Sequence, residues 1–100
     1  MLHTVNKSPY SADSFELCLD YASAGDVILL LEDGVYAALK GGSGSLAIQR
    51  HMKDKTFAAL VPDLKARGIT SDKIIAGIQN VDYDGFVTLV AQSDKVQSWL

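Results

Sequence analysis

The stretch Val27–Leu31, with the sequence VILLL, is a continuous apolar run, and Glu32, Asp33 and Gly34 follow it directly. A strand buried on both faces of a parallel sheet has this pattern, because helices cover both of its sides and leave no polar face. We therefore expect Val27–Leu31 to be a central strand that ends in a turn. A parallel sheet in turn requires crossover helices, so this run favours an α/β fold.

Strand and helix patterns alternate on both sides of this run. Leu2–Val5 is expected to be a first strand, and a helix should follow it, with a cap at Ser11 or Asp13 and a stop at Gly25. The apolar face of that helix repeats at helical spacing and comprises Phe15, Cys18, Leu19 and Ala22. The later expected elements are a helical segment at Val35–Leu39, helical turns at Ser45–Met52, a strand at Phe57–Val61, a short helix that Pro62 opens and Gly68 closes, a turn capped by Ser71, a strand within Ile74–Val81, a helix capped by Asp82 with the apolar face Tyr83, Phe86, Val87 and Val90, and a closing strand at Val96–Leu100.

This alternation predicts one domain, residues 1–100, with a three-layer, open, mostly parallel sheet of about five strands and helices on both faces. The composition is that of a globular protein, with 48% hydrophobic and 21% charged residues. The net charge of −3 and the pI of about 5.1 argue against direct nucleic-acid binding. No apolar run approaches the roughly 18 residues of a membrane helix, and no signal peptide is recognisable, so we expect a cytoplasmic protein without membrane contact.

The charges are unevenly distributed along the chain. Residues 8–39 contain six acids and no Lys or Arg, whereas residues 40–73 contain seven bases and three acids. Two interpretations are open. These blocks are either solvated faces of surface helices or complementary docking surfaces for a protein partner.

The glycine-rich stretch Gly41–Ser45 formally matches a relaxed dinucleotide fingerprint, through Gly42, Gly44 and Ala47. The fingerprint needs a strand directly before its glycines, but a helical segment is expected there, which favours a flexible surface loop. A small nucleotide- or anion-binding module that uses this loop remains the hypothesis of a different class. Glu32, Asp33 and Gly34 occupy the ligand-binding edge of such sheets, where we expect a turn and, for any function, contact with a partner.

No metal or cofactor site is expected. His3 and His51 have no second ligand at metal-binding spacing, and each is interpreted as a structural, hydrogen-bonded histidine. Cys18 is the only cysteine, which excludes an internal disulfide and a cysteine-based zinc cluster. Cys18 lies on the expected apolar stripe among Asp13, Glu16 and Asp20, so a buried thiol is expected, and the carboxylates oppose formation of a thiolate.

Five blocks in order give the sequence a resemblance to the DsrH/TusB family of small sulfur-relay subunits. The blocks are LHTVNKSP at 2–9, LLLEDGVYAAL at 29–39, PDLKARG at 62–68, VDYDGFVTL at 81–89 and VQSWL at 96–100. The resemblance implies a DsrE/F-like fold. It also implies assembly with DsrE-like and DsrF-like paralogous subunits into a heterohexamer, with the main persulfide cysteine on a paralogous subunit.

The same resemblance implies a sulfurtransferase complex that relays persulfide sulfur to or from a small DsrC/TusE-like carrier protein. The sequence is closest to the sulfur-oxidising DsrH branch, which is similar to this chain in having a cysteine in the first helix, here Cys18. Cys18 is therefore the candidate accessory persulfide thiol. The alternative is a TusB-like structural subunit in the relay that thiolates the wobble uridine of tRNA. An isolated subunit is expected to self-associate through the surface meant for its paralogues.

Overall fold

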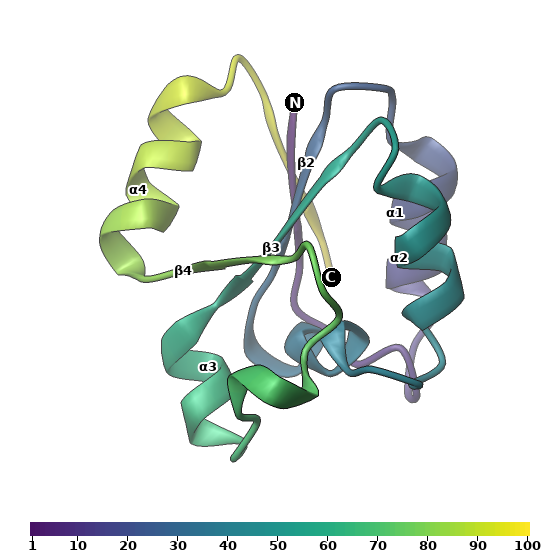
Figure 1. The fold of residues 1–100 in the computed structure, drawn as a ribbon. Coiled ribbons are helices and arrows are strands. Elements are labelled where there is room, and N and C mark those ends of the chain that lie inside the picture. The colour runs from purple at the N-terminus through teal and green to yellow at the C-terminus, as the bar shows by residue number, and fades with distance from the viewer.

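A five-stranded, all-parallel sheet forms the centre of the molecule (Figure 1). The computed structural model describes all residues, 1–100. The strands have the spatial order β4-β3-β2-β1-β5 and are β1 (Leu2–Val5), β2 (Val27–Leu30), β3 (Thr56–Leu60), β4 (Gln79–Val81) and β5 (Val96–Trp99). The helices are α1 (Ser14–Tyr21), α2 (Ser45–His51), α3 (Val61–Ala66) and α4 (Tyr83–Gln92), with 3-10 segments η1 (Glu32–Ala38) and η2 (Ser71–Lys73). The predicted α/β class and parallel sheet are confirmed.

β2 is the central strand, as its apolar run predicts. Val27 pairs with Leu2 of β1 on one side and with Thr56 of β3 on the other, and the register continues in parallel to Leu30. Ile28, Leu29 and Leu30 are completely buried. A strand with two neighbours and with cover on both faces has no solvent-facing side, which is why it carries no polar residue.

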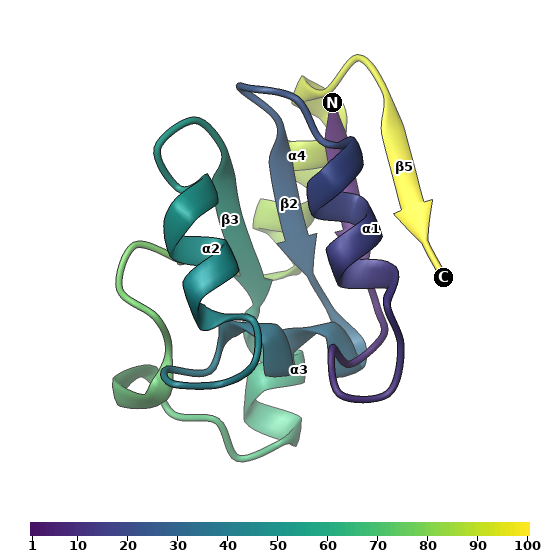
Figure 2. The same cartoon turned by 90° about the vertical axis from the view of Figure 1, so that its right-hand side faces the viewer.

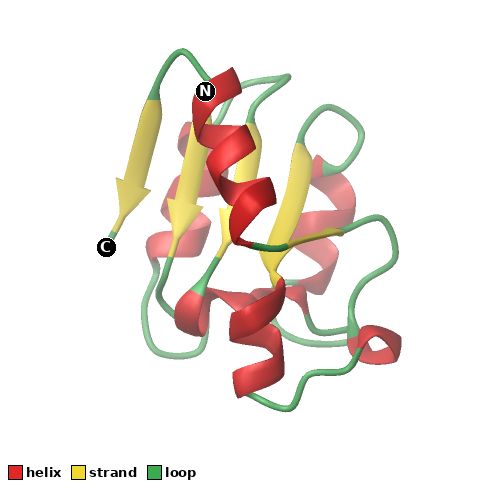
Figure 3. Ribbon diagram, turned by 90° about the vertical axis from the view of Figure 1, so that its left-hand side faces the viewer, coloured by secondary structure: helices red, strands yellow, loops and turns green.

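The two faces of the sheet are covered very unequally. α1 and α2 lie over one face (Figure 2), where they join one core cluster of sixteen buried residues that includes Phe15, Ile28 and Phe57. α4 alone crosses the opposite face (Figure 3), where the second cluster has only three buried residues, Leu2, Leu29 and Ala58. The hydrophobic core is therefore almost entirely on the α1/α2 side.

The strand expected within Ile74–Val81 is confirmed and spans Gln79–Val81, because Ile74 and Ile75 are buried in the core and Gly77 has a φ of 96°. Other expected local features are wrong. Asp13 sits at the N-cap of α1 without a side-chain capping bond, and α1 ends four residues before Gly25, which lies in the following turn. Val61 begins α3 rather than ending β3.

The apolar face expected for α4 is also only partly correct. Phe86 is half-buried and packs with Leu89 against the smaller cluster, but Tyr83, Val87 and Val90 are 60%, 66% and 41% exposed. The residues that touch the sheet are therefore rotated around the helix from the ones that the periodicity selects. No helix is both long and apolar enough to span a membrane.

Gly34 lets the turn after β2 pass directly over the end of β1. A Cβ atom at this position would lie 2.0 Å from the carbonyl oxygen of Val5, which is backbone and cannot move aside. We predict that Gly34→Ala lowers the free energy of unfolding by about 3 kcal/mol or more, measured by urea denaturation.

Gly25→Ala is the control for Gly34→Ala. Gly25 has a φ of 87° but open space around its Cβ position, so only backbone strain of about 1–2 kcal/mol is expected. Equal destabilisation by the two substitutions would contradict the steric explanation for Gly34.

Candidate functional site

The carboxyl ends of β1, β2 and β3 meet at one edge of the sheet, and the loops that follow them carry most of the polar groups there. Open parallel sheets place their ligands at this edge. Glu32 and Asp33 follow β2, and Asp63 lies in the first turn of α3, directly after β3. The structure therefore brings the sequence-predicted Glu32–Asp33–Gly34 turn beside α3.

Arg67, the residue that directly follows α3, links the loops at this edge. Its Nη2 and Nε atoms lie 2.8 and 2.9 Å from Asp33 Oδ1, and its Nη1 donates to the Asp63 carbonyl oxygen at 3.1 Å. Asp63 in turn accepts a hydrogen bond from the backbone N–H of Glu32 at 2.6 Å. These bonds hold Glu32 at a φ of 49°, a left-handed conformation that is costly for a residue other than glycine. The turn is thus fixed by Arg67 and Asp63, and the Asp33 carboxylate is ion-paired with Arg67.

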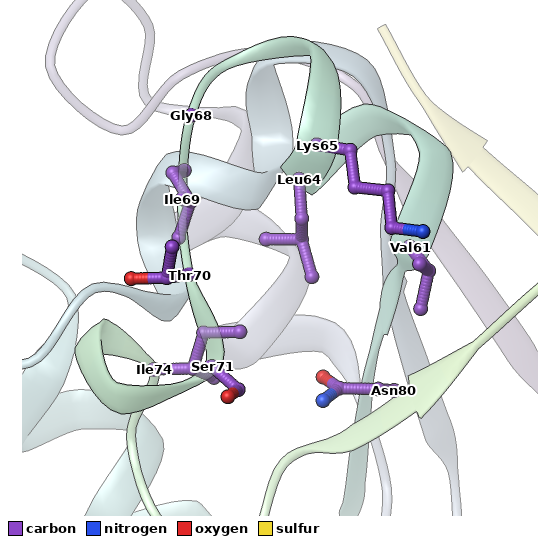
Figure 4. Close-up of a pocket in the computed structure, with 9 residues that line it drawn as sticks. All are labelled: Val61, Leu64, Lys65, Gly68, Ile69, Thr70, Ser71, Ile74 and Asn80. Atoms are coloured by element: carbon purple, nitrogen blue, oxygen red, sulfur yellow. The ribbon is translucent and has the colours of Figure 1, made fainter.

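A hollow of about 450 Å³ lies beside this cluster, between α3, η2 and β4 (Figure 4). Its floor is apolar and consists of the buried residues Leu64, Ile69 and Ile74, while Lys65, Ser71 and Asn80 stand at its rim. None of its lining residues is a Cys, His, Asp or Glu. The hollow can accommodate an apolar group, but it holds neither a thiol nor a carboxylate or imidazole that could act as a general base.

Cys18 lies away from this edge, in the core under α1. The residue is completely buried. Burial, together with the nearby Asp26 carboxylate, raises the pKa of the Cys18 thiol to about 12. The predicted burial is confirmed, but the carboxylate that acts on the thiol is Asp26 and not Asp13, Glu16 or Asp20. A protonated, enclosed thiol is a poor nucleophile in this conformation, and the accessory relay role of Cys18 stays a prediction.

His3 is the centre of a buried polar network that joins three parts of the chain. The indole N–H of Trp99 donates to His3 Nδ1 at 3.1 Å, so the other nitrogen, Nε2, carries the proton and donates to Asp26 Oδ2 at 2.8 Å. His3 is completely buried, which confirms its interpretation as a structural histidine. The network links β1, the turn before β2 and β5.

Asp26 remains ionised in this network. Burial by itself would raise the pKa of its carboxyl group, but hydrogen bonds from His3 and from the backbone N–H of Ser23 outweigh burial and lower the pKa to about 2. The residue is only 8% exposed. A paired, buried carboxylate of this kind stabilises the fold only as long as it keeps its charge and its donors.

The glycine stretch is shaped by packing. A Cβ on Gly42 would lie 2.7 Å from the Tyr10 hydroxyl, and one on Gly44 would lie 3.2 Å from the Phe15 ring. The segment before the stretch is the 3-10 helix η1 and not a strand, so the phosphate-binding geometry of the dinucleotide fingerprint is missing. His51 is the last residue of α2, and no three His, Cys, Asp or Glu residues gather where they could hold a metal ion.

Sequence reasoning missed both the hollow and the partners of His3. Asn80 lines the same hollow as Lys65 because β4 pairs with β3, and Trp99 reaches His3 because β5 pairs with β1. These contacts span long stretches of chain and leave no local spacing signal. The one local sign of the His3 network was Asp26, because an acidic residue directly before a buried strand needs a hydrogen-bond donor nearby.

Comparison with known proteins gives a consistent result along the whole chain. The family model described as DsrH like protein matches residues 7–96. A relative named Protein TusB from Pectobacterium parmentieri is 39% identical over 100 residues, with 99% of this chain and all of that protein covered. Protein TusB from Escherichia coli O81 (strain ED1a) is 40% identical over 99 residues, again covering 99% of this chain and all of the relative.

Solved structures share the fold at low sequence identity. The ychN protein from E. coli has a TM-score of 0.74 and 18% identity, covering 97% of each chain. The protein MTH1491 from Methanobacterium thermoautotrophicum has a TM-score of 0.70 and 16% identity, covering 97% of this chain and 95% of its own. These likenesses concern the fold alone.

The Asp26 carboxylate should give stability a specific pH dependence. Because its folded pKa lies below the ordinary carboxyl value, its contribution of about 2 kcal/mol is present above pH 4 and is lost as the pH falls toward 2. We predict that Asp26→Asn destabilises the chain at pH 7 and reduces this acid loss. Urea unfolding followed by Trp99 fluorescence between pH 7 and pH 2.5 measures both effects.

Asp84→Asn, at an exposed position, is the matched control and should leave the pH profile of the wild type unchanged. An Asp26→Asn profile parallel to that of the wild type would show that Asp26 does not carry the pH dependence.

The Cys18 thiol should be inert in the folded chain. A pKa of about 12 instead of 9 reduces the thiolate fraction near pH 8 by about a thousandfold, and burial blocks access as well. We predict negligible reaction with Ellman's reagent over minutes, and complete reaction in 6 M guanidinium chloride. A native reaction rate within tenfold of that of a small free thiol would contradict the buried placement.

Proposed function

This chain belongs to the DsrH/TusB family, and from that premise we propose that it is a TusB-type subunit of a sulfur-relay complex. One observation carries the proposal. Proteins named TusB match 99% of the chain at about 40% identity, and the match covers their own full length. The match therefore extends over the whole subunit and is not confined to one part of it.

The chemistry of persulfide transfer supports a role as a non-principal subunit. A thiolate attacks the outer sulfur of a persulfide, a new S–S bond forms as the old one breaks, and the donor cysteine leaves as a thiolate. The only thiol of this chain is enclosed and protonated. In our proposal the principal cysteine therefore belongs to a paralogous subunit, and this chain supports the assembly that presents it.

The proposed assembly is a cytoplasmic heterohexamer with two copies each of this chain, a DsrE-like subunit and a DsrF-like subunit. Its sulfur passes to or from a small carrier protein of the DsrC/TusE type. The net charge of −3 argues against direct binding of tRNA, and in our proposal the sulfur reaches the nucleic acid through the other proteins of the relay.

Thiolation of the wobble uridine of tRNA is the proposed destination of the sulfur, since the curated relatives bear the TusB name. We predict that deletion of the gene abolishes 2-thiouridine in tRNA, measured by mass spectrometry of tRNA hydrolysates. The wild-type gene and Cys18→Ala should both restore it. Unchanged thiolation in the deletion strain would contradict this destination.

Sulfur oxidation is the second candidate, because a cysteine occupies the first helix at Cys18. In that branch Cys18 acts as an accessory persulfide thiol after a movement of α1 exposes it. The test is intact-protein mass spectrometry of the complex after incubation with a persulfide donor.

A gain of one sulfur on this chain, absent in Cys18→Ala, would support the accessory role and the sulfur-oxidation branch. Sulfur confined to another subunit would leave Cys18 as a packing residue and would contradict that role.

A further inference from the structure

The outward face of α4 is apolar and exposed. Tyr83, Val87, Val90 and Ala91 follow one another at helical spacing, with Tyr83 and Val87 exposed by 60% and 66%. Together with the edge of Phe86, the last three line a shallow hollow of about 260 Å³ that is almost wholly apolar. We call these five residues the α4 face. Contiguous apolar surface of this kind is typical of a protein-binding site.

The layer beneath the α4 face is incomplete. From Ala76 to Leu100 no residue is buried, although this segment includes two strands and the longest helix of the chain. α4, which crosses this side of the sheet (Figure 3), is the only helix whose residues pack against the smaller cluster. Val96, which pairs with Leu2 and so shares that side, is 47% exposed. All-parallel sheets normally have both faces covered. The side of the sheet under α4 is therefore expected to be covered further by another protein surface.

The charges around the α4 face define what can cover it. Between Ile74 and Asp94 there are three acids and no Lys or Arg. Asp82 and Asp84, which we call the acidic rim, lie at the start of α4, whereas Asp94 follows its end, lies 3.6 Å from the N-terminal ammonium and precedes Lys95. A second copy of this chain, docked through the same face in a twofold dimer, would bring two α4 helices together, and neither helix contains a Lys or Arg. Asp82 and Asp84 of each copy would therefore find no cation on the other helix.

We propose that the α4 face binds another subunit of the relay complex, through an apolar surface on that subunit that Lys or Arg residues flank. The proposal rests on the proposed function, since it names the surface by which this chain enters the complex. Apolar contact with Val87 and the aromatic rings of Tyr83 and Phe86 supplies the affinity. The acidic rim sets orientation and association rate, and it favours a partner with Lys or Arg over a second copy.

The test uses the three co-expressed subunits, with assembly measured by native mass spectrometry and the affinity of this chain for its partners by analytical ultracentrifugation. Val87→Asp should weaken assembly at least tenfold, because it places a charge in the centre of the contact. Leu46→Asp is the matched control. Leu46 is 69% exposed on α2, over the opposite face of the sheet, and its substitution should leave assembly unchanged.

The acidic rim has its own test. Asp84→Lys should slow association several-fold at 50 mM NaCl, and the difference from wild type should shrink at 500 mM NaCl. Asp82 is left intact because its carboxylate accepts the capping hydrogen bond from the Gly85 N–H.

The outcomes separate this proposal from the proposed function. Wild-type subunits that fail to assemble would overturn the proposed function. Assembly of the wild type together with unchanged assembly of Val87→Asp would overturn only the α4 face. Val87→Asp is checked for folding by its thermal unfolding, and Val90→Thr, a nearly isosteric polar change, should weaken assembly if Val87→Asp proves unstable. Twofold dimers of the isolated chain that Val87→Asp disrupts, with assembly unaffected, would also overturn the proposal.

Discussion

The constraint on which this structure depends is that a parallel sheet must be covered on both faces. β2 is apolar from end to end because neighbouring strands enclose its edges and helices enclose its sides. On the α1/α2 side the requirement is met by sixteen buried residues. On the α4 side three buried residues and a single helix meet it only in part. The layer that contains α1 and α2 is therefore fully packed, while the layer that contains α4 retains apolar surface that a partner can cover.

This asymmetry explains how the chemistry is distributed. The well-packed layer contains the groups that look reactive in the sequence, Cys18 and His3, and it buries both completely. Cys18 fills core space as a protonated thiol, and His3 bonds Asp26 and Trp99 to join the first and last strands. The chain thus has no accessible thiol on its surface. Its surface consists of exposed apolar and charged side chains. In our proposal, a subunit with these properties contributes to the relay through the assembly that it helps to build.

Much of the fold follows from the sequence because the deciding signals are local. The VILLL run, Pro62 at the first turn of α3 and Asp82 as the cap of α4 each determine their elements within a few residues. Sequence reasoning fails where contacts with distant segments decide which of two local conformations or orientations is adopted. Ile74 and Ile75 look like a strand but are drawn into the core, and α4 turns Phe86 and Leu89 to the sheet, leaving Val87 outside. The candidate site is the less predictable part, because Asp33 reaches Arg67 only through strand pairing, and the local i,i+4 pair of Asp63 and Arg67 does not by itself indicate a site.

Hydrogen–deuterium exchange of this chain, alone and in the assembled complex, tests the central claim most directly. In the isolated chain, β1, β2 and β3 should exchange slowly, and the amides of β4, α4 and β5 should exchange faster, because that quarter of the chain has no buried residue. On assembly the largest gain of protection should fall on α4. The account would be contradicted if α4 were already as protected as β2 in the isolated chain, or if assembly protected α1 and α2 and left α4 unchanged.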